Sequence, residues 1–384
     1  MIYLDNSATS FPKPEEVYLF MDHFYRSKGV NPGRSGFDAA IATEEMVAST
    51  RKMLTQLFNG TNSNRLTFSY NATDSLNLIL NGLLEKDDHV VTTMLEHNSV
   101  LRPLYHLALN KTIEVTYVPF DQRGYVHPDD INKAIRKKTK LVVMNHSSNV
   151  IGTIQPVAEI GKICREKNVL LVLDASQSAG ISPIDIQAMC IDVLIFTGHK
   201  CMMGPTGIGG SYVADHVTIR QTRFGGTGVR SAQKTHLEEY PYRLESGTPN
   251  ILGIAGLNAG IRWINNQGIN VLHAREMKLW NKLRMGLQQI EGVTTYCAED
   301  PEDKNAVLSF TISGFNNPVD IGTMLDVDHN IACRIGYQCA PYVHELIGTG
   351  KTNGTIRFSI GPFNTEDHID KAIEAVADIA SLKN

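Results

Sequence analysis

The chain has 384 residues, of which 42% are hydrophobic and 20% are charged. This length suits roughly two to three domains and excludes a single small module, and the composition excludes a disordered or fibrous chain. The formal net charge of −4 is too small, and of the wrong sign, for a groove that binds nucleic acid or for contact with an anionic membrane. We therefore expect the partners to be small molecules or other proteins.

Strands and helices alternate from about residue 65 to residue 215. Short apolar runs predict strands at residues 66–69, 90–93, 141–144, 169–173 and 193–197, and helical patterns follow at 75–84, 100–109 and 157–167. This alternation is typical of an α/β fold with a mostly parallel sheet and right-handed crossovers. Ligands of such sheets gather beyond the carboxyl ends of the strands.

The pattern changes after about residue 255 to that of a smaller α+β unit. Helices are predicted at residues 254–266, 273–290 and 365–382, and strands at 306–312 and 355–360. No repeat or Pro/Ser-rich linker separates the two units. We expect a large domain over residues 15–255 and a small domain over 256–384, packed together and joined by the N-terminal segment 1–14, with the binding site in the cleft between them.

Three further features concern location and metals. No segment approaches the roughly 18 uninterrupted apolar residues of a membrane helix, so we expect no membrane span. Asp5 stands where a signal peptide would carry a basic and then an apolar stretch, which favours a cytoplasmic protein. The six cysteines include no C-x-x-C pair, which argues against a disulfide framework or a zinc ribbon, and we expect no metal site.

Two strands end in residues that carry chemistry. One leads into Thr197-Gly198-His199-Lys200, and the strand before it leads into Asp174. A lysine in such a loop is most often solvated, and a lone aspartate there often caps a helix. Together they suggest pyridoxal phosphate, for which a lysine forms the Schiff base and a carboxylate keeps the pyridine nitrogen protonated. Gln177 could reach the hydroxyl of the ring.

Other strand ends supply further candidates for this cofactor. Residues 71–75 predict a helix N-terminus that suits a phosphate group, with Ala72 and Thr73 as contacts and an ordinary helix cap as the alternative. His97 could stack on the ring, although a lone histidine there is more often structural. Asn149 follows another strand and could touch the ring or the substrate.

Seven motifs in a fixed order carry a resemblance to a known family. They are Tyr3-Leu4-Asp5-Asn6-Ser7-Ala8-Thr9, Ser148-Asn149-Val150-Ile151-Gly152-Thr153, Asp174-x-x-Gln177, Thr197-Gly198-His199-Lys200, Gly204-Pro205-Thr206-Gly207-Ile208-Gly209, Glu245-Ser246-Gly247-Thr248-Pro249-Asn250 and Arg357-Phe358-Ser359. The chain resembles the class V aminotransferases, which are pyridoxal-phosphate enzymes, and in particular their cysteine desulfurase and selenocysteine lyase branch. The matching motifs span residues 3 to about 364.

The resemblance implies a fold type I transferase, a homodimer and active sites shared between subunits. It assigns the Schiff base to Lys200, the pyridinium contact to Asp174, the contact with the ring hydroxyl to Gln177 and ring stacking to His97. The phosphate contacts are assigned to Thr73, Thr197 and His199. Thr248 would contact the phosphate of the cofactor that the partner subunit holds. It also implies that Arg357 binds the substrate carboxylate in a bidentate manner, with Asn149 and Arg334 as further substrate contacts.

The segment from Cys333 to Tyr342 bears on the choice of reaction. It resembles the desulfurase pattern Arg-x-Gly-x-x-Cys-Ala, which implies that Cys339 accepts the sulfur. The flanking glycine and proline predict a loop, whereas the alternative for Cys339 is a buried, inert thiol. Related desulfurases commonly have histidine where this chain has Gln338 and Phe37.

The resemblance therefore predicts a cysteine desulfurase that converts L-cysteine to L-alanine. The Lys200 amine would remove the Cα proton, and the Cys339 thiolate would attack the substrate sulfur and become a persulfide. Cations near the thiol, such as Arg334 or His344, would favour the thiolate. A protein that accepts the sulfur is an expected partner.

Several alternatives stay open. Selenocysteine lyases share the motifs, and a class V aminotransferase or a carbon–sulfur β-lyase would use the cofactor without the thiol. A non-catalytic scaffold for sulfur delivery would keep only the fold, and the presence of Lys200, Asp174 and Arg357 counts against it.

Overall fold

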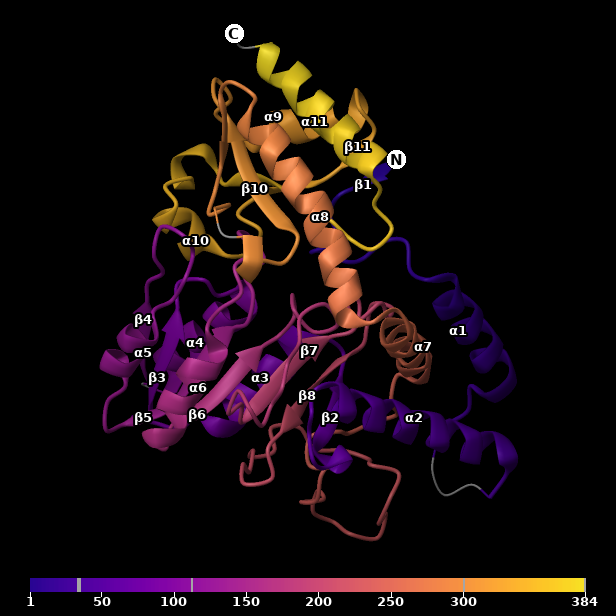
Figure 1. The fold of residues 1–384 in the computed structure, drawn as a ribbon. Helices are drawn as coiled ribbons and strands as arrows, with labels where there is room; N and C mark the ends of the chain where they lie inside the picture. The colour runs from indigo at the N-terminus through magenta and orange to yellow at the C-terminus, as the bar shows by residue number, and fades with distance from the viewer. Residues whose placement is uncertain (33–35, 112, 300, 383–384) are drawn as a thin grey trace.

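A seven-stranded sheet forms the centre of the larger part of the molecule (Figure 1). The computed structural model describes residues 1–32, 36–111, 113–299 and 301–382. The strands of the sheet are β2 (Leu66–Ser69), β3 (His89–Thr93), β4 (Glu114–Val118), β5 (Thr139–Asn145), β6 (Leu170–Asp174), β7 (Val193–Thr197) and β8 (Gly209–Val213). They lie in the order β2-β8-β7-β6-β5-β3-β4, and β8 is antiparallel to both of its neighbours while the pairs from β7 to β4 are parallel. The predicted mostly parallel sheet is confirmed.

Helices cover both faces of this sheet, as predicted. They are α1 (Glu15–Lys28), α2 (Asp38–Leu57), α3 (Ala72–Leu83), α4 (Asn98–Lys111), α5 (Pro128–Ala134), α6 (Val157–Glu166) and α7 (Ile251–Gln267). On β5, Leu141 and Val143 join the apolar cluster formed with α3 and α4, and Val142 and Met144 join the cluster formed with α2, α6 and α7. Successive side chains of a strand point to opposite faces, and a sheet covered on both sides therefore has nearly continuous apolar strands.

A second, smaller sheet forms the C-terminal part. The antiparallel strands β9 (Val293–Thr295), β10 (Val307–Ile312), β12 (Arg334–Gly336) and β13 (Thr355–Ser359) lie in the order β12-β13-β10-β9. They pack with α8 (Ile269–Gln288), α9 (Pro318–Val327) and α11 (Glu366–Ser381) around a core that includes Trp280, Phe310 and Phe358. The short helix α10 (Pro341–Leu346) follows β12. The predicted smaller α+β unit is confirmed except for one helix. The helix predicted at residues 254–266 is α7, and its apolar residues, such as Ile254 and Leu257, pack in the core of the larger sheet.

The N-terminus of the chain belongs with this C-terminal part. β1 (Ile2–Tyr3) pairs in parallel with β11 (Ile331–Ala332), and Leu4 lies in the C-terminal core. The division into domains at residue 255 stays a prediction, and that residue lies within α7. None of the helices in the described parts of the chain is both long and apolar enough to cross a bilayer.

Candidate active site

The carboxyl ends of β6 and β7 bring Lys200 and Asp174 together. Asp174 is the last residue of β6 and pairs in register with Ile195 of β7, and Lys200 follows the end of β7 by three residues. Burial lowers the pKa of the Lys200 amine to about 8, with Asp174 acting in the opposite direction and Arg357 lowering it further. A lysine with this pKa is partly neutral near neutral pH, which a nucleophile or a base requires.

Hydrogen bonds fix the turn that follows β6. The Asp174 carboxylate accepts a hydrogen bond from the backbone N–H of Ser176 at 2.9 Å. The Gln177 side chain is buried, and its Nε2 donates to the Ser7 carbonyl at 3.0 Å. Both side chains are thus held at the ligand edge of the sheet.

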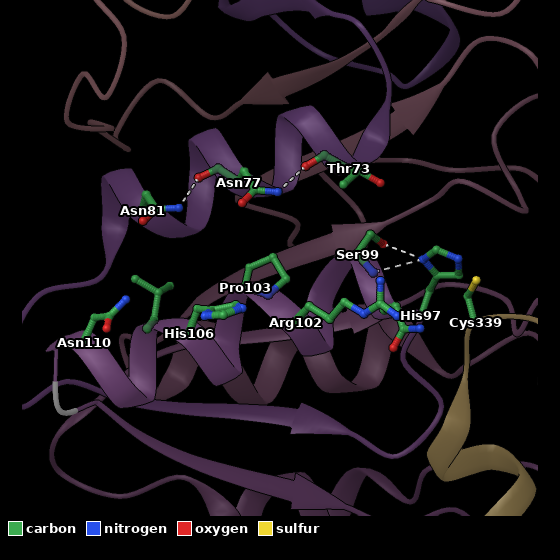
Figure 2. Close-up of a pocket in the computed structure, with 12 residues that line it drawn as sticks. Thr73, Asn77, Asn81, His97, Ser99, Arg102, Pro103, His106, Asn110 and Cys339 are labelled. Atoms are coloured by element: carbon green, nitrogen blue, oxygen red, sulfur yellow. Dashed lines mark hydrogen bonds between the residues drawn. The ribbon is translucent and has the colours of Figure 1, made fainter.

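His97 lies just before α4 as a neutral imidazole (Figure 2). Its Nδ1 accepts a hydrogen bond from the backbone N–H of Ser99 at 3.0 Å, which leaves the ring proton on Nε2. Burial, followed by the charge of Lys200, lowers the pKa of His97 to about 4, against the opposing effect of Asp174. His97 therefore shares the electrostatic environment of Lys200 and Asp174.

Orphaned polar atoms mark the region predicted to hold a phosphate. Thr197 Oγ1 and His199 Nδ1 are buried and have no hydrogen-bond partner within the described structure. Thr73 and Ala72 form the first turn of α3, which is capped by the Asn71 side chain. Buried polar atoms are costly unless they are paired, so these atoms and the helix N-terminus fit a phosphate-bearing ligand.

Arg357 is buried on β13 and shares a carboxylate with Arg334. Its Nη2 donates to Asp5 Oδ1 at 2.7 Å and its Nη1 donates to the Asn149 carbonyl at 2.9 Å. Arg334 contacts the other oxygen of Asp5 at 2.7 Å. Arg357 Nε is buried and has no partner in the described residues. The guanidinium is therefore fixed in place, with its Nε–H still available for a ligand.

Cys339 lies in the loop between β12 and α10, as predicted, and its side chain is exposed. Its carbonyl accepts a hydrogen bond from the backbone N–H of Asn98 at 2.7 Å. It lines a cavity of about 470 Å³ together with His97 and Thr73 (Figure 2). The loop thus places a thiol at the same cavity as two of the predicted cofactor contacts.

The expectation that His344 provides a cation near the thiol is wrong. His344 is fully buried, and burial lowers its pKa to about 4, so the imidazole is neutral. Its ring nitrogens contact Thr349 Oγ1 at 2.8 Å and Gln338 Oε1 at 3.0 Å. Gln338 also donates to the Thr355 carbonyl at 3.0 Å. His344 and Gln338 therefore stabilise the loop through their hydrogen bonds. The charge of Arg334, the other expected cation, is paired with Asp5.

Thr248 is not among the residues that line the cavity of Cys339. It is exposed, in the loop between β8 and α7. The loop is anchored by Glu245, which accepts hydrogen bonds from Arg51 at 2.8 and 3.1 Å and from the backbone N–H of Phe68 at 2.7 Å. Thr248 therefore lies on an anchored loop, where its exposed side chain can contact another molecule.

The family model of the class-V aminotransferases matches residues 2–372. The chain belongs to the class-V aminotransferase family. A relative from Methanothermobacter thermautotrophicus, named a probable cysteine desulfurase, is 31% identical over 99% of this chain and 95% of the relative. A relative from Pyrococcus abyssi with the same name is 33% identical over 99% of this chain and 94% of the relative.

Solved structures of two cysteine desulfurases show the same fold. The apo cysteine desulfurase from Thermococcus onnurineus NA1 has a TM-score of 0.93 at 33% identity and covers 99% of this chain and 94% of that one. A cysteine desulfurase from Escherichia coli, in an S-sulfonic acid form, has a TM-score of 0.89 at 26% identity and covers 100% of this chain and 95% of that one.

Residues that the sequence analysis did not single out also lie near this candidate site. Glu96 is fully buried, and its Oε1 accepts hydrogen bonds from Thr93 Oγ1 at 2.6 Å and from the Asn145 N–H at 3.1 Å. Burial raises the pKa of Glu96 to about 8. A charged residue three positions after the end of a predicted strand, next to a candidate histidine, was the signal that could have drawn attention to it.

Lys13 and Asp5 are the other such residues. Lys13 Nζ donates to the His199 carbonyl at 2.6 Å, and Thr9 Oγ1 donates to the same carbonyl at 3.0 Å. The N-terminal segment therefore holds the peptide that precedes Lys200. Asp5 stood within a family motif, but nothing local to it indicated that it would pair with two arginines more than 300 residues away in the chain.

Proposed function

We propose that the protein is a pyridoxal-phosphate-dependent cysteine desulfurase that converts L-cysteine to L-alanine and transfers the sulfur to Cys339. The observation that carries this proposal is the exposed Cys339 thiol in the cavity that His97 also lines. An aminotransferase or a β-lyase has no use for a thiol at that place. The names of the relatives support the same reaction.

The residues present fit the cofactor. Pyridoxal phosphate, when bound, stores in its ring the electrons released at the substrate Cα. Lys200 would hold it through the amine, Asp174 through the pyridine nitrogen, Gln177 through the ring hydroxyl, His97 by stacking, and Ala72, Thr73, Thr197 and His199 at the phosphate. The orphaned Thr197 Oγ1 and His199 Nδ1 support this placement.

Two residues would prepare the substrate. Arg357 would bind the substrate carboxylate, because its positive charge is buried and its Nε has no partner among the described residues, with Arg334 and Asn149 close by. Lys200 would take the Cα proton, since a pKa of about 8 leaves a share of neutral amine at physiological pH and a base is most effective near that pKa.

Cys339 would carry out the sulfur transfer. Its thiolate attacks the substrate sulfur, an S–S bond forms, and the C–S bond breaks with its electron pair remaining on the substrate Cβ. That carbon then takes up a proton, and alanine leaves while the sulfur stays on Cys339 as a persulfide. The exposure of Cys339 also makes the persulfide accessible to an outside acceptor.

We further propose a homodimer in which Thr248 contacts the phosphate of the partner's cofactor. The exposed Thr248 on a loop anchored by the Glu245–Arg51 ion pair supports this arrangement. A protein sulfur acceptor and a cytoplasmic location stay predictions.

Three variants test the proposed reaction. The purified, cofactor-loaded protein should form alanine and sulfide from cysteine in the presence of a thiol reductant. Lys200→Ala should abolish all turnover, and Cys339→Ala should reduce alanine formation at least a hundredfold. Cys333→Ala is the matched control and should keep most of the activity, because burial raises the pKa of the Cys333 thiol to about 12 and a neutral thiol is a poor nucleophile.

Three results would contradict the proposal. If Cys339→Ala still forms alanine from cysteine at the wild-type rate, the reaction is that of a lyase which does not use the thiol. If that variant loses activity on cysteine but keeps it on selenocysteine, the physiological substrate is selenocysteine. A protein that binds no cofactor, and therefore shows no visible absorbance, would be a scaffold.

A further inference from the structure

The residues that line the cavity at Cys339 include a positive charge but no negative one. It lies between α3 and α4 and extends beyond the predicted cofactor contacts (Figure 2). Its lining residues are Thr73, Asn77, Asn81, His97, Asn98, Ser99, Arg102, Pro103, His106, Leu107, Asn110 and Cys339. Arg102 contributes a permanent positive charge, and none of these lining residues is an aspartate or a glutamate. The lining residues therefore carry a net positive charge, which would attract a negatively charged small molecule.

The geometry of α4 directs Arg102 toward the thiol. Arg102 follows Asn98 by four residues, so both lie on one face of the helix. Long side chains of a helix slant toward its N-terminus, which is where the Asn98 N–H holds the Cys339 carbonyl at 2.7 Å. Figure 2 shows the Arg102 side chain extending toward His97 and Cys339. The charge of Arg102 also contributes to the lowered pKa of His97.

Arg102 differs from the other two arginines of the site, because both of those form an ion pair with a carboxylate. Arg334 and Arg357 are both paired with Asp5. Arg102 is exposed, and within the described parts of the chain no carboxylate forms an ion pair with it. Among the described residues of the chain, no carboxylate therefore neutralises its charge.

We propose that Arg102 is a positioning residue that draws negatively charged thiol acceptors to the sulfur on Cys339. This inference rests on the proposed desulfurase function and concerns the step that removes the sulfur. The acceptor thiolate attacks the outer sulfur of the Cys339 persulfide, and a new S–S bond forms on the acceptor. The S–S bond to Cys339 breaks, and its electron pair remains on Cys339 as the thiolate, so no oxidant is needed. The acceptor class is a small thiol that carries a carboxylate.

Matched acceptors test this preference. 3-Mercaptopropionate, 2-mercaptoethanol and cysteamine carry a negative, a neutral and a positive group beside the thiol. The holoenzyme is loaded with ³⁵S from labelled cysteine in a single turnover, and the rate of ³⁵S discharge is measured with each acceptor. We expect the wild type to prefer 3-mercaptopropionate over cysteamine, and Arg102→Gln to reduce that preference about fivefold, the factor that one exposed ion pair provides. Arg102→Lys should retain most of it.

The control variant is Arg165→Gln. Arg165 is an exposed arginine on α6 and does not line the cavity, so this variant should behave like the wild type. The proposal is overturned if Arg102→Gln and Arg165→Gln show the same acceptor preference as the wild type.

A second measurement does not depend on turnover. Cys339 of the holoenzyme without substrate is alkylated with iodoacetate, which is anionic, and with iodoacetamide, which is neutral, and the modified peptide is quantified by mass spectrometry. We expect Arg102→Gln to lower the iodoacetate-to-iodoacetamide rate ratio about fivefold. An unchanged ratio would overturn the role of Arg102. A lowered ratio in a protein whose Cys339 never takes up sulfur would instead overturn the proposed function.

Discussion

Glu96 is a buried acid that links the ends of two neighbouring strands. Its Oε1 is bonded to Thr93 at the end of β3 and to Asn145 at the end of β5, next to Asp174. Because burial raises its pKa from 4.5 to about 8, the folded state holds a proton there that the unfolded state releases above about pH 4.5. The neutral Glu96 side chain therefore joins the ends of the two strands. It does so at the position that immediately precedes His97 in the chain.

This charge state makes a prediction about stability. A raised acid pKa means that the contribution of Glu96 to stability is fully present below the unfolded pKa and declines as the pH rises to about 8. Between pH 6.5 and 8 the free energy of unfolding should decrease by about 1–2 kcal/mol more in the wild type than in Glu96→Gln. Urea denaturation across this range measures the difference, and equal slopes in both proteins would show that Glu96 is already ionised.

Asp5 is the counter-ion of a buried arginine. Removing one partner of a buried ion pair leaves the other charge uncompensated and typically costs about 3–5 kcal/mol. Asp5→Asn should therefore lower the free energy of unfolding by about 3 kcal/mol, because Arg357 is only 3% exposed. Arg334→Gln is the control and should cost about 1 kcal/mol or less, since that side chain is 48% exposed. Equal losses in the two variants would contradict this account of the pair.

At the scale of elements, the loop between β12 and α10 determines where the thiol lies. Gln338 and Cys339 have φ angles of +41° and +58°, a region that side chains adopt only when their surroundings hold them there. The side chain of Gln338 provides this support through Thr355 and His344. The glutamine thus takes a structural role at a position where related desulfurases commonly have histidine.

Gln338→Ala should separate two steps of the proposed reaction. Without the Thr355 and His344 contacts the loop loses its fixed conformation, so sulfur transfer to Cys339 should slow about tenfold, as small misplacements of a reacting group do. Removal of the Cα proton, measured as exchange of that hydrogen with D₂O, should stay near the wild-type rate, because Lys200 lies on another element. If both rates fall together, the loop does more than position the thiol.

The sequence pattern predicted the central strands of the large sheet, whose residues are mostly buried. β3, β5, β6 and β7 are buried on both faces, and their predicted bounds differ from the observed ones by at most two residues. β8 escaped detection because it begins with two glycines; a Cβ on Gly210 would lie 2.3 Å from the Thr67 carbonyl oxygen, so the close approach of β2 requires glycine there. β4 escaped because its residues are mostly half-exposed at the edge of the sheet.

In the site, too, local sequence patterns predicted some features, whereas contacts between distant parts of the chain could not be predicted. Asp174 ends a buried strand, and Lys200 and His97 follow two others. Parallel strands bring their carboxyl ends to one edge, so the sequence could place these residues together. The pairing of Asp5 with Arg357 and the contact of Cys339 with Asn98 join distant parts of the chain, and no local pattern encodes them. The charge of His344 was mispredicted because its burial depends on the packing of α10.

At the scale of the whole molecule, the N-terminal segment connects the two parts of the site. β1 pairs with β11 and Asp5 pairs with Arg357 in the C-terminal part, whereas Thr9 and Lys13 hold the His199 carbonyl beside Lys200. The group proposed to bind the substrate carboxylate and the amine proposed to take its proton are therefore held by one short stretch of chain. Their relative position depends on segments that are far apart in the sequence.

The most direct test of the account follows the sulfur itself. The cofactor-loaded protein is mixed with less than one equivalent of ³⁵S-labelled cysteine, quenched by alkylation and digested, and the labelled peptide is identified by mass spectrometry. The account predicts one extra sulfur on Cys339, released by a reducing agent and formed in equal amount to alanine. Alanine formation with the label on Cys333, or on no cysteine at all, would contradict it.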